Sequence, residues 1–83
     1  MTETDLVIGI ERRLIEQYGP ILGGKNLSNV LGFPSIAAFR QALWRKRIPV
    51  PVFSLPQRRG KFALSRDVAV WLAEQRQRAT REN

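Results

Sequence analysis

Breaks rich in proline and glycine divide this chain and limit how long any element of secondary structure can be. They are Gly19-Pro20, Gly32-Phe33-Pro34-Ser35, Ile48-Pro49-Val50-Pro51 and Pro56-Gln57-Arg58-Arg59-Gly60. Proline lacks the backbone donor of a helix or strand and biases the residue before it toward extended geometry, and glycine readily ends a helix. A chain of 83 residues cut at these points predicts a single domain over residues 1–83, built from short elements.

Apolar residues recur at helical spacing in the segments between these breaks, which predicts a mainly α-helical domain. The expected helices cover about 3–18, 25–31, 36–47 and 65–76. Gly32 can end the second helix in a left-handed conformation, and Ser35 and Ser65 are placed to cap the third and fourth helices.

Two short segments before the last helix predict the strands of a small β-hairpin. Val52–Leu55 and Lys61–Leu64 have the alternating pattern of strands, and the turn-forming residues 56–60 separate them. We expect this hairpin to span about 52–64, with Arg58 and Arg59 at its tip.

The first expected helix has more apolar surface than one buried stripe needs. Val7, Ile10, Leu14 and Tyr18 make that stripe, and further apolar residues lie partly off it. These additional residues are Leu6, Ile8 and Ile15. They contact the domain's own core more widely, or they are buried in a homodimer or a side-by-side multimer formed through helix 3–18.

The charges are segregated along the chain. Residues 17–66 contain no acidic residue, although the whole chain has seven, and they contain nine basic ones. The nine are Lys25, Arg40, Arg45, Lys46, Arg47, Arg58, Arg59, Lys61 and Arg66. Positive potential of this kind attracts a polyanion through steering and counterion release, so nucleic acid is the first partner to consider.

The absence of two residue types narrows the possible functions. The sequence has neither Cys nor His, which removes disulfides, thiolate metal sites, the commonest general base and the commonest nitrogen ligand. We therefore expect no enzyme, no cofactor and no metal. The apolar runs are only a few residues long, which predicts no membrane span and a cytoplasmic location.

The order of helix, turn, helix, proline-rich step, basic hairpin and capped helix resembles the winged helix-turn-helix of the excisionase, AlpA and MerR-type DNA-binding superfamily. The matching residues are Leu27-Ser28-Asn29-Val30-Leu31-Gly32, Arg47-Ile48-Pro49-Val50-Pro51, and Lys61-Phe62-Ala63-Leu64-Ser65-Arg66-Asp67-Val68 leading into Trp71-Leu72. The resemblance covers roughly residues 20–75. It implies a winged helix-turn-helix with an extra N-terminal helix, a recognition helix at Ser35–Arg47 and a wing at Leu55–Lys61.

The resemblance also implies a function. It predicts a small protein that binds double-stranded DNA sequence-specifically, as a transcriptional regulator or an excisionase-like factor of a mobile element. Such a factor would be associated with a bacterial nucleoid, and a recombinase or a polymerase would be its expected protein partner.

The expected DNA contacts follow from the chemistry of the exposed residues. Arg40 can bond guanine and Gln41 adenine, and Ala37 can touch a thymine methyl group in the major groove. The remaining residues are expected on phosphates or in the flanking minor groove. The full set is Lys25, Ser28, Asn29, Ser35, Ala37, Arg40, Gln41, Arg45, Lys46, Arg47, Arg58, Arg59 and Lys61.

Other interpretations stay open at this point. The cations at 45–47 and 58–59 could be a solvated helix end and a soluble turn, and Arg40 and Gln41 could be ordinary surface residues. We expect Trp71 in the core, and Trp44 as a core residue rather than an exposed contact. The alternative functions are a protein–protein adaptor or anti-regulator and an RNA-binding module, for which Phe53 and Phe62 would be the stacking residues.

Overall fold

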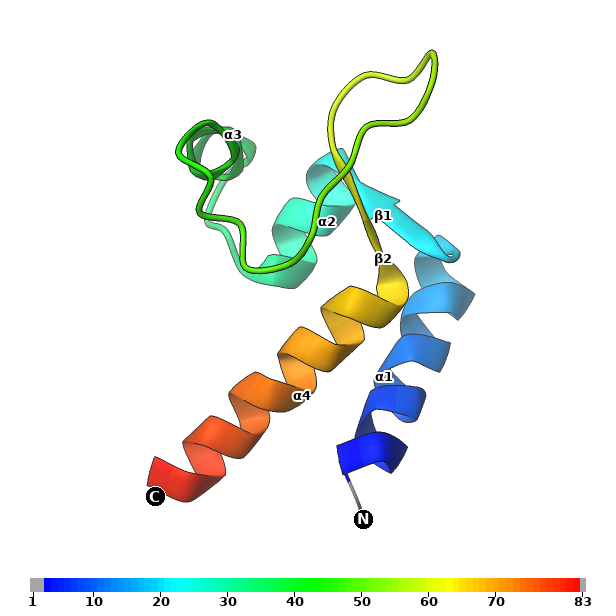
Figure 1. Cartoon of the computed structure of the whole chain (residues 1–83), viewed down its shortest axis with the longest axis vertical. Coiled ribbons are helices and arrows are strands. Elements are labelled where there is room, and N and C mark those ends of the chain that lie inside the picture. The colour runs from blue at the N-terminus through cyan, green and yellow to red at the C-terminus, as the bar shows by residue number, and fades with distance from the viewer. Residues whose placement is uncertain (1–2, 83) are drawn as a thin grey trace.

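The computed structural model describes residues 3–82 and shows a mainly helical domain with one small sheet (Figure 1). In chain order the elements are α1 (Glu3–Tyr18), β1 (Ile21–Gly23), α2 (Gly24–Leu31), α3 (Ile36–Trp44), β2 (Phe62–Leu64) and α4 (Ser65–Glu82). None of the helices in this part of the chain has the length and apolar character needed to cross a lipid bilayer.

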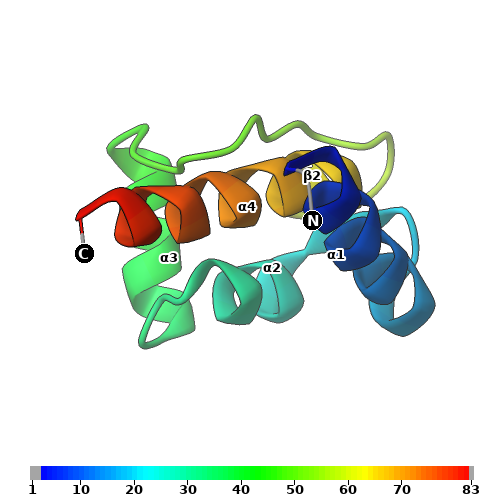
Figure 2. The same ribbon diagram turned by 90° about the horizontal axis from the view of Figure 1, so that it is seen from below.

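The two long helices form one side of the molecule. α1 and α4 pack against each other, run in opposite directions and diverge toward their free ends (Figure 1). The sheet lies above them, and α2 and α3 lie on its other side, where the loop over residues 45–61 passes beside α3 (Figures 1 and 2).

The core is assembled from every element and from the loop. Leu14 of α1, Leu22 of β1 and Val50 of the loop are buried together with residues of the other elements. The remaining members of this buried cluster are Leu27, Leu31, Phe39, Ala63, Val68 and Ala69. Val50 shows why the proline-rich step is part of the fold: the two prolines beside it hold the chain extended while its side chain reaches the core.

The sheet pairs two segments that are far apart in sequence. β1 and β2 are antiparallel, with Ile21 opposite Leu64 and Gly23 opposite Phe62. A Cβ atom at residue 23 would lie 2.5 Å from Cε1 of Phe62, so the ring occupies the space that a side chain would need. Glycine is therefore required there for a steric reason.

The prediction of a hairpin between 52–55 and 61–64 is wrong in its extent, because the two segments are paired at one position. Phe53 makes a single β-bridge to Phe62, through hydrogen bonds of 2.9 and 2.8 Å, and the rest of 52–61 is an irregular loop. Pro51 and Pro56 bracket the segment and cannot donate backbone hydrogen bonds, so a longer ladder cannot form easily there. The principal partner of β2 is β1.

The start of α3 agrees with the sequence prediction and its end does not. The Ser35 Oγ accepts a 3.0 Å hydrogen bond from the Ala38 backbone, which makes Ser35 the N-cap. The helix ends at Trp44 rather than Arg47, because the chain turns there in a Schellman arrangement. Arg47 donates to the Ala42 carbonyl, and Lys46, with φ of 55°, donates to that of Leu43.

The other helix ends follow from their terminal residues. α2 ends at Leu31, with Gly32 in the left-handed conformation as expected. α4 extends to Glu82, past the expected end near residue 76, because no Gly or Pro interrupts residues 65–82. The buried Ser65 begins this helix, and the hydrogen bond that its hydroxyl donates goes to Gly19.

Candidate nucleic-acid interface

The outer face of α3 carries two long polar side chains, one alanine and one large aromatic side chain. Ile36, Phe39 and Leu43 face inward, and the buried Phe39 ring meets Phe33 edge to face at a centroid distance of 5.6 Å. The residues on the opposite face are all exposed; they are Ala37, Arg40, Gln41 and Trp44. The spacing of three, four and seven residues puts them on one side of the helix, so α3 presents a continuous strip to solvent.

Trp44 is the clearest departure from expectation. Its side chain is 86% exposed, so the prediction that it belongs to the core is wrong. The reason is its helical phase, because it lies seven residues after the exposed Ala37 and off the inward stripe that ends at Leu43. Trp71, which we expected in the core, packs against the core cluster as a partly buried side chain.

Arginines from α3 and from the loop meet at one depression, which we call the arginine hollow. Arg40 of α3 lines it together with Arg59 and Lys61 of the loop, around a volume of about 350 Å³. The other lining residues are Gly24, Ile36, Phe39, Leu43 and Gly60. The fold thus brings together cations that are about twenty residues apart in sequence, and none of the lining residues is acidic.

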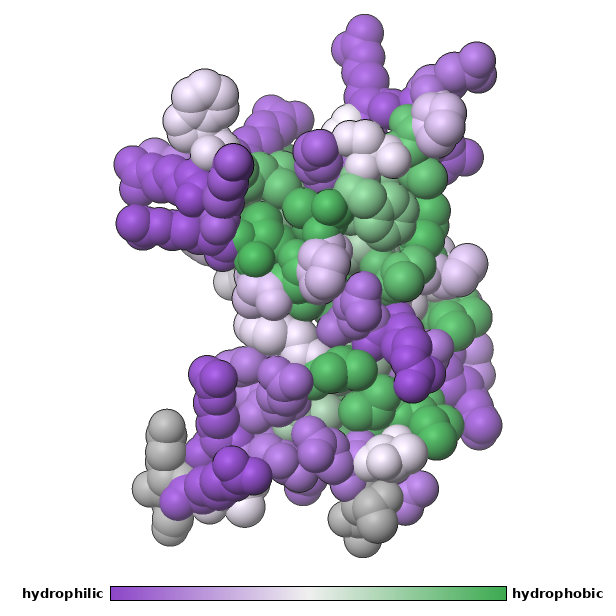
Figure 3. Space-filling model, in the orientation of Figure 1, coloured by the Kyte–Doolittle hydropathy of each residue, from purple (hydrophilic) through white to green (hydrophobic). Residues whose placement is uncertain are grey.

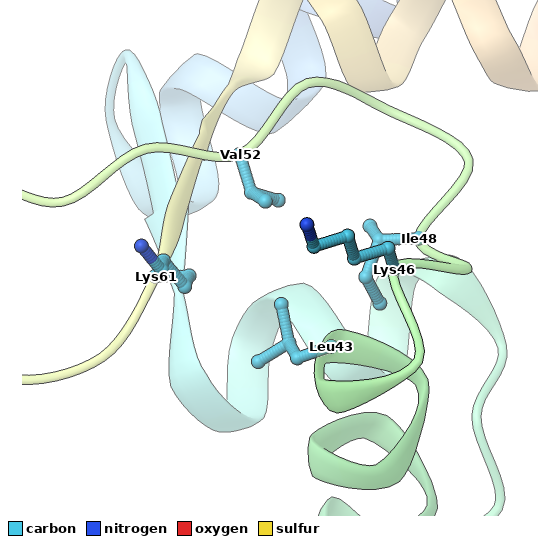
Figure 4. Close-up of a pocket in the computed structure, with 5 residues that line it drawn as sticks. All are labelled: Leu43, Lys46, Ile48, Val52 and Lys61. Carbon is cyan, nitrogen blue, oxygen red and sulfur yellow. The ribbon is translucent and has the colours of Figure 1, made fainter.

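A neighbouring depression, the lysine hollow, continues along the same side of α3. Leu43, Ile48 and Val52 form its apolar wall, Lys46 and Lys61 are its cations, and its volume is about 330 Å³ (Figure 4). The Lys46 side chain extends across this hollow toward Val52, whereas the Lys61 ammonium turns away from it. That ammonium donates a 2.8 Å hydrogen bond to the Ser54 Oγ. Leu43 and Lys61 line both hollows, which therefore adjoin.

The surface around the hollows combines an apolar floor with a hydrophilic rim. In Figure 3 an apolar area lies between α3 and the loop, and hydrophilic side chains project around it. The loop carries Arg58 and Arg59, both exposed, on a turn in which the Arg58 backbone donates to the Leu55 carbonyl at 3.2 Å. Gln57 and Gly60 take positive φ angles there, so the loop turns sharply at both residues.

One expected contact is excluded by burial. Ser28 is only 1% exposed, and its hydroxyl donates to the Ser35 carbonyl, so its side chain connects α2 to the start of α3 and does not reach the surface. Lys25 and Asn29 of α2 are exposed, as are Ser35 and the three cations Arg45, Lys46 and Arg47. The helical spacing could have indicated the burial of Ser28, because Ser28 lies three residues before the inward-facing Leu31 and so on the same side of α2.

Arg66 differs from the other cations of the acid-free region. Its Nη1 lies 3.5 Å from Oε1 of Glu11, an ion pair between the start of α4 and the middle of α1. Arg66 is therefore engaged on the α1 side of the molecule. Among the described residues, no group of three or more acidic side chains is placed to hold a metal ion.

No protein-family model, curated protein sequence or solved structure matches this chain in the comparisons.

Proposed function

We propose that this protein binds double-stranded DNA sequence-specifically, with α3 in the major groove. The observation that supports this most strongly is the arginine hollow. Arg40 of the helix and Arg59 and Lys61 of the loop lie around one depression, although Arg40 is about twenty residues from the other two in the sequence. A single polyanion could contact all three, and residues 17–66 contain no acidic side chain to repel it.

The dimensions of α3 suit this role. An α-helix with its side chains is about 10–12 Å across and fits the major groove, which is about 12 Å wide, and α3 has nine residues, or about two and a half turns, to lie along it. Arg40 and Gln41 are exposed in the middle of the helix, and they can read guanine and adenine respectively. Ala37, one turn earlier, is small enough to lie close to a base edge.

The flanking cations would fix the position of the helix. Lys25 and Asn29 of α2 lie on the N-terminal side of the motif, where the preceding helix would cross a phosphate strand. Lys46 and its neighbours follow the end of α3, and Arg58 and Arg59 extend from the loop. In this arrangement the contacts with phosphates would fix the position of the protein along the duplex, and the contacts of α3 with base edges would supply the sequence preference.

The biological role that we propose is that of a transcriptional regulator or an excisionase-like factor of a bacterial mobile element. The order of α2, α3, loop, β2 and α4 agrees with the winged helix-turn-helix layout that the sequence resembles. The loop would act as the wing in spite of its single bridge. We place the protein on the nucleoid, with a recombinase or a polymerase as its neighbour on DNA.

Binding titrations with labelled duplex, single-stranded DNA and RNA at rising salt test this function. The duplex should bind most tightly, and the paired change Arg58→Ala and Arg59→Ala should reduce the salt slope by about two units. The paired change Arg78→Ala and Arg81→Ala is the matched control, because it removes the same charge from exposed positions on α4. Equal losses from both pairs, or tighter binding of RNA, would contradict the proposal.

A protein contact is the second candidate function, and α1 favours it. Ile8 and Ile15 are 45% and 43% exposed and lie seven residues apart on one face of this helix. Apolar side chains in this arrangement suit a second copy bound side by side on DNA. Light scattering of Ile8→Glu and the parent, with and without DNA, tests it: the parent should assemble on the duplex and the variant should not. Identical masses would remove α1 from any such interface.

A further inference from the structure

Trp44 exposes far more apolar surface than any other large hydrophobic residue in the described chain. Its side chain is 86% exposed, while the other exposed large hydrophobic residues, Ile8, Ile15 and Leu64, are at 45% or less. An indole in contact with water does not contribute the stabilisation that an aromatic side chain provides when it is buried. Tryptophan is enriched at binding interfaces, because its ring is apolar and its N–H is polar, so an indole this exposed beside a row of cations suits contact with a partner.

The neighbours of Trp44 indicate what that partner is. Trp44 shares the exposed face of α3 with Arg40 and Gln41, and Arg45, Lys46 and Arg47 follow it directly. No acidic residue occurs anywhere in residues 17–66. A partner that covers Trp44 must approach these cations too, so charge complementarity selects a polyanion that also offers apolar surface.

We propose that Trp44 recognises thymine by packing its indole against the C5-methyl group in the major groove. This rests on the proposed binding of duplex DNA by α3. The thymine methyl is the apolar group that base pairs present in the major groove, and apolar side chains select it there. The recognition is thus an additional specificity determinant, distinct from the hydrogen bonds of Arg40 and Gln41.

The helix geometry places this contact relative to the others. Trp44 lies four residues after Arg40, which is a rise of about 6 Å along α3. Successive base pairs are about 3.4 Å apart, so the thymine lies roughly two base pairs from the one that Arg40 contacts. The cations at residues 45–47 would then bind the phosphates that flank this position.

Replacement of thymine by deoxyuridine provides a direct test, because it removes only the methyl group. Alternating dA–dT and dA–dU duplexes of equal length are titrated with the parent protein, Trp44→Ala and Trp44→Phe at one fixed salt concentration. The parent should lose about fourfold in affinity for each methyl group that the indole covers. In Trp44→Ala that loss should disappear, while Trp44→Phe should retain part of it. Contacts of Ala37 with methyl groups affect parent and variant equally, so the difference between the two isolates Trp44.

Tryptophan emission gives a second readout that does not depend on affinity. In a Trp71→Phe background Trp44 is the remaining tryptophan, and its emission should shift to shorter wavelength when saturating dA–dT duplex covers the indole. Circular dichroism and melting of each variant verify the fold. Trp44→Ala should melt like the parent because the side chain is exposed.

Several outcomes would overturn the assignment. Equal losses on deoxyuridine DNA in the parent and in Trp44→Ala would show that the indole does not touch the methyl. Weaker binding of Trp44→Ala to both duplexes alike would assign it to the sugar and phosphate backbone instead. An unchanged emission wavelength at saturation would show that the duplex does not cover Trp44, and a protein partner would then be the candidate that covers it. A parent that binds no duplex at all would instead refute the DNA-binding function itself.

Discussion

The hydroxyl of Ser65 donates a 2.7 Å hydrogen bond to the carbonyl of Gly19, across 46 residues of sequence. The Ser65 backbone also donates to the Pro20 carbonyl at 2.8 Å. Ser65 is completely buried, and this pair joins the end of α1 to the start of α4. The two long helices are therefore held in register at the edge of the sheet, and the sheet in turn supports the loop beside α3.

We expect Ser65→Ala to lower the free energy of unfolding by about 1–3 kcal/mol, because it removes the partner of the Gly19 carbonyl at a position where Ser65 itself is buried. Chemical denaturation at equilibrium measures this loss. Thr80→Ala is the matched control, since its hydroxyl donates to the Arg76 carbonyl at 3.0 Å on an exposed part of α4. If the two variants unfold at the same denaturant concentration, the hydrogen bond from Ser65 contributes nothing measurable.

Gly23→Ala should destabilise the fold by about 1–3 kcal/mol, a typical cost of forcing extra atoms into a packed site. The new Cβ would overlap the Phe62 ring, and the extended backbone of Gly23, with φ of −146° and ψ of 165°, adds no strain of its own. Gly9→Ala is the control, because nothing lies within 4 Å of a Cβ there. In the exposed middle of α1 it should stabilise by about 0.5–1 kcal/mol. Gly23→Ala should lower the melting temperature relative to the parent and Gly9→Ala should raise it. Two shifts in the same direction would contradict the steric explanation.

The features predicted from sequence are those that depend on neighbouring residues. Ser35 caps α3 and Gly32 ends α2 because each acts on the backbone a few residues away. The pairing of β1 with β2 depends on contacts between residues 21–23 and 62–64, which no local pattern specifies. The neighbouring segment 52–55 was the nearer candidate in sequence, and its flanking prolines limit it to one bridge.

The candidate site was predictable to a similar degree. Arg40 and Gln41 are exposed as the inward stripe of α3 requires, because helical spacing fixes the two faces. Residue type misled us at Trp44, where size suggested burial while helical phase places it outside. Ser28 is the reverse case, a polar side chain that the phase of α2 places inside. In both, periodicity was the better guide than residue chemistry. The meeting of Arg40 with Arg59 depends on the path of the loop, which local patterns do not give.

Lys46→Gly should separate stability from DNA binding. Lys46 occupies the left-handed position after α3, where a residue with a side chain costs about 1–2 kcal/mol relative to glycine. We therefore expect the glycine variant to unfold at higher temperature and, having lost a cation of the lysine hollow, to bind duplex with a salt slope lower by about one unit. Lys46→Gln removes the charge and keeps the strained backbone, so it should lower the salt slope without raising the melting temperature. A glycine variant that melts below the parent would mean that the Lys46 side chain stabilises the fold by packing.

The last prediction distinguishes base reading from attraction to phosphate within the acid-free region. Arg40→Ala should weaken binding to a selected site by about 1–3 kcal/mol and affect scrambled duplex much less, because Arg40 is expected to contact a base. Arg58→Ala should weaken both duplexes equally, because its expected contact is with phosphate. Both side chains are exposed, so neither change should alter the free energy of unfolding by more than about half a kcal/mol.

Arg66→Ala is the internal control for that comparison. It removes one charge from the same acid-free region, but Arg66 is engaged with Glu11 on the α1 side, so its loss should leave the salt slope of DNA binding unchanged. Titrations of the three variants on selected and scrambled duplexes at several salt concentrations give all these quantities. If Arg66→Ala lowers the slope as much as Arg58→Ala, DNA responds to the total charge rather than to the surface formed by α3 and the loop. If Arg40→Ala weakens both duplexes equally, α3 touches only phosphates, and sequence preference must arise from the shape of the DNA.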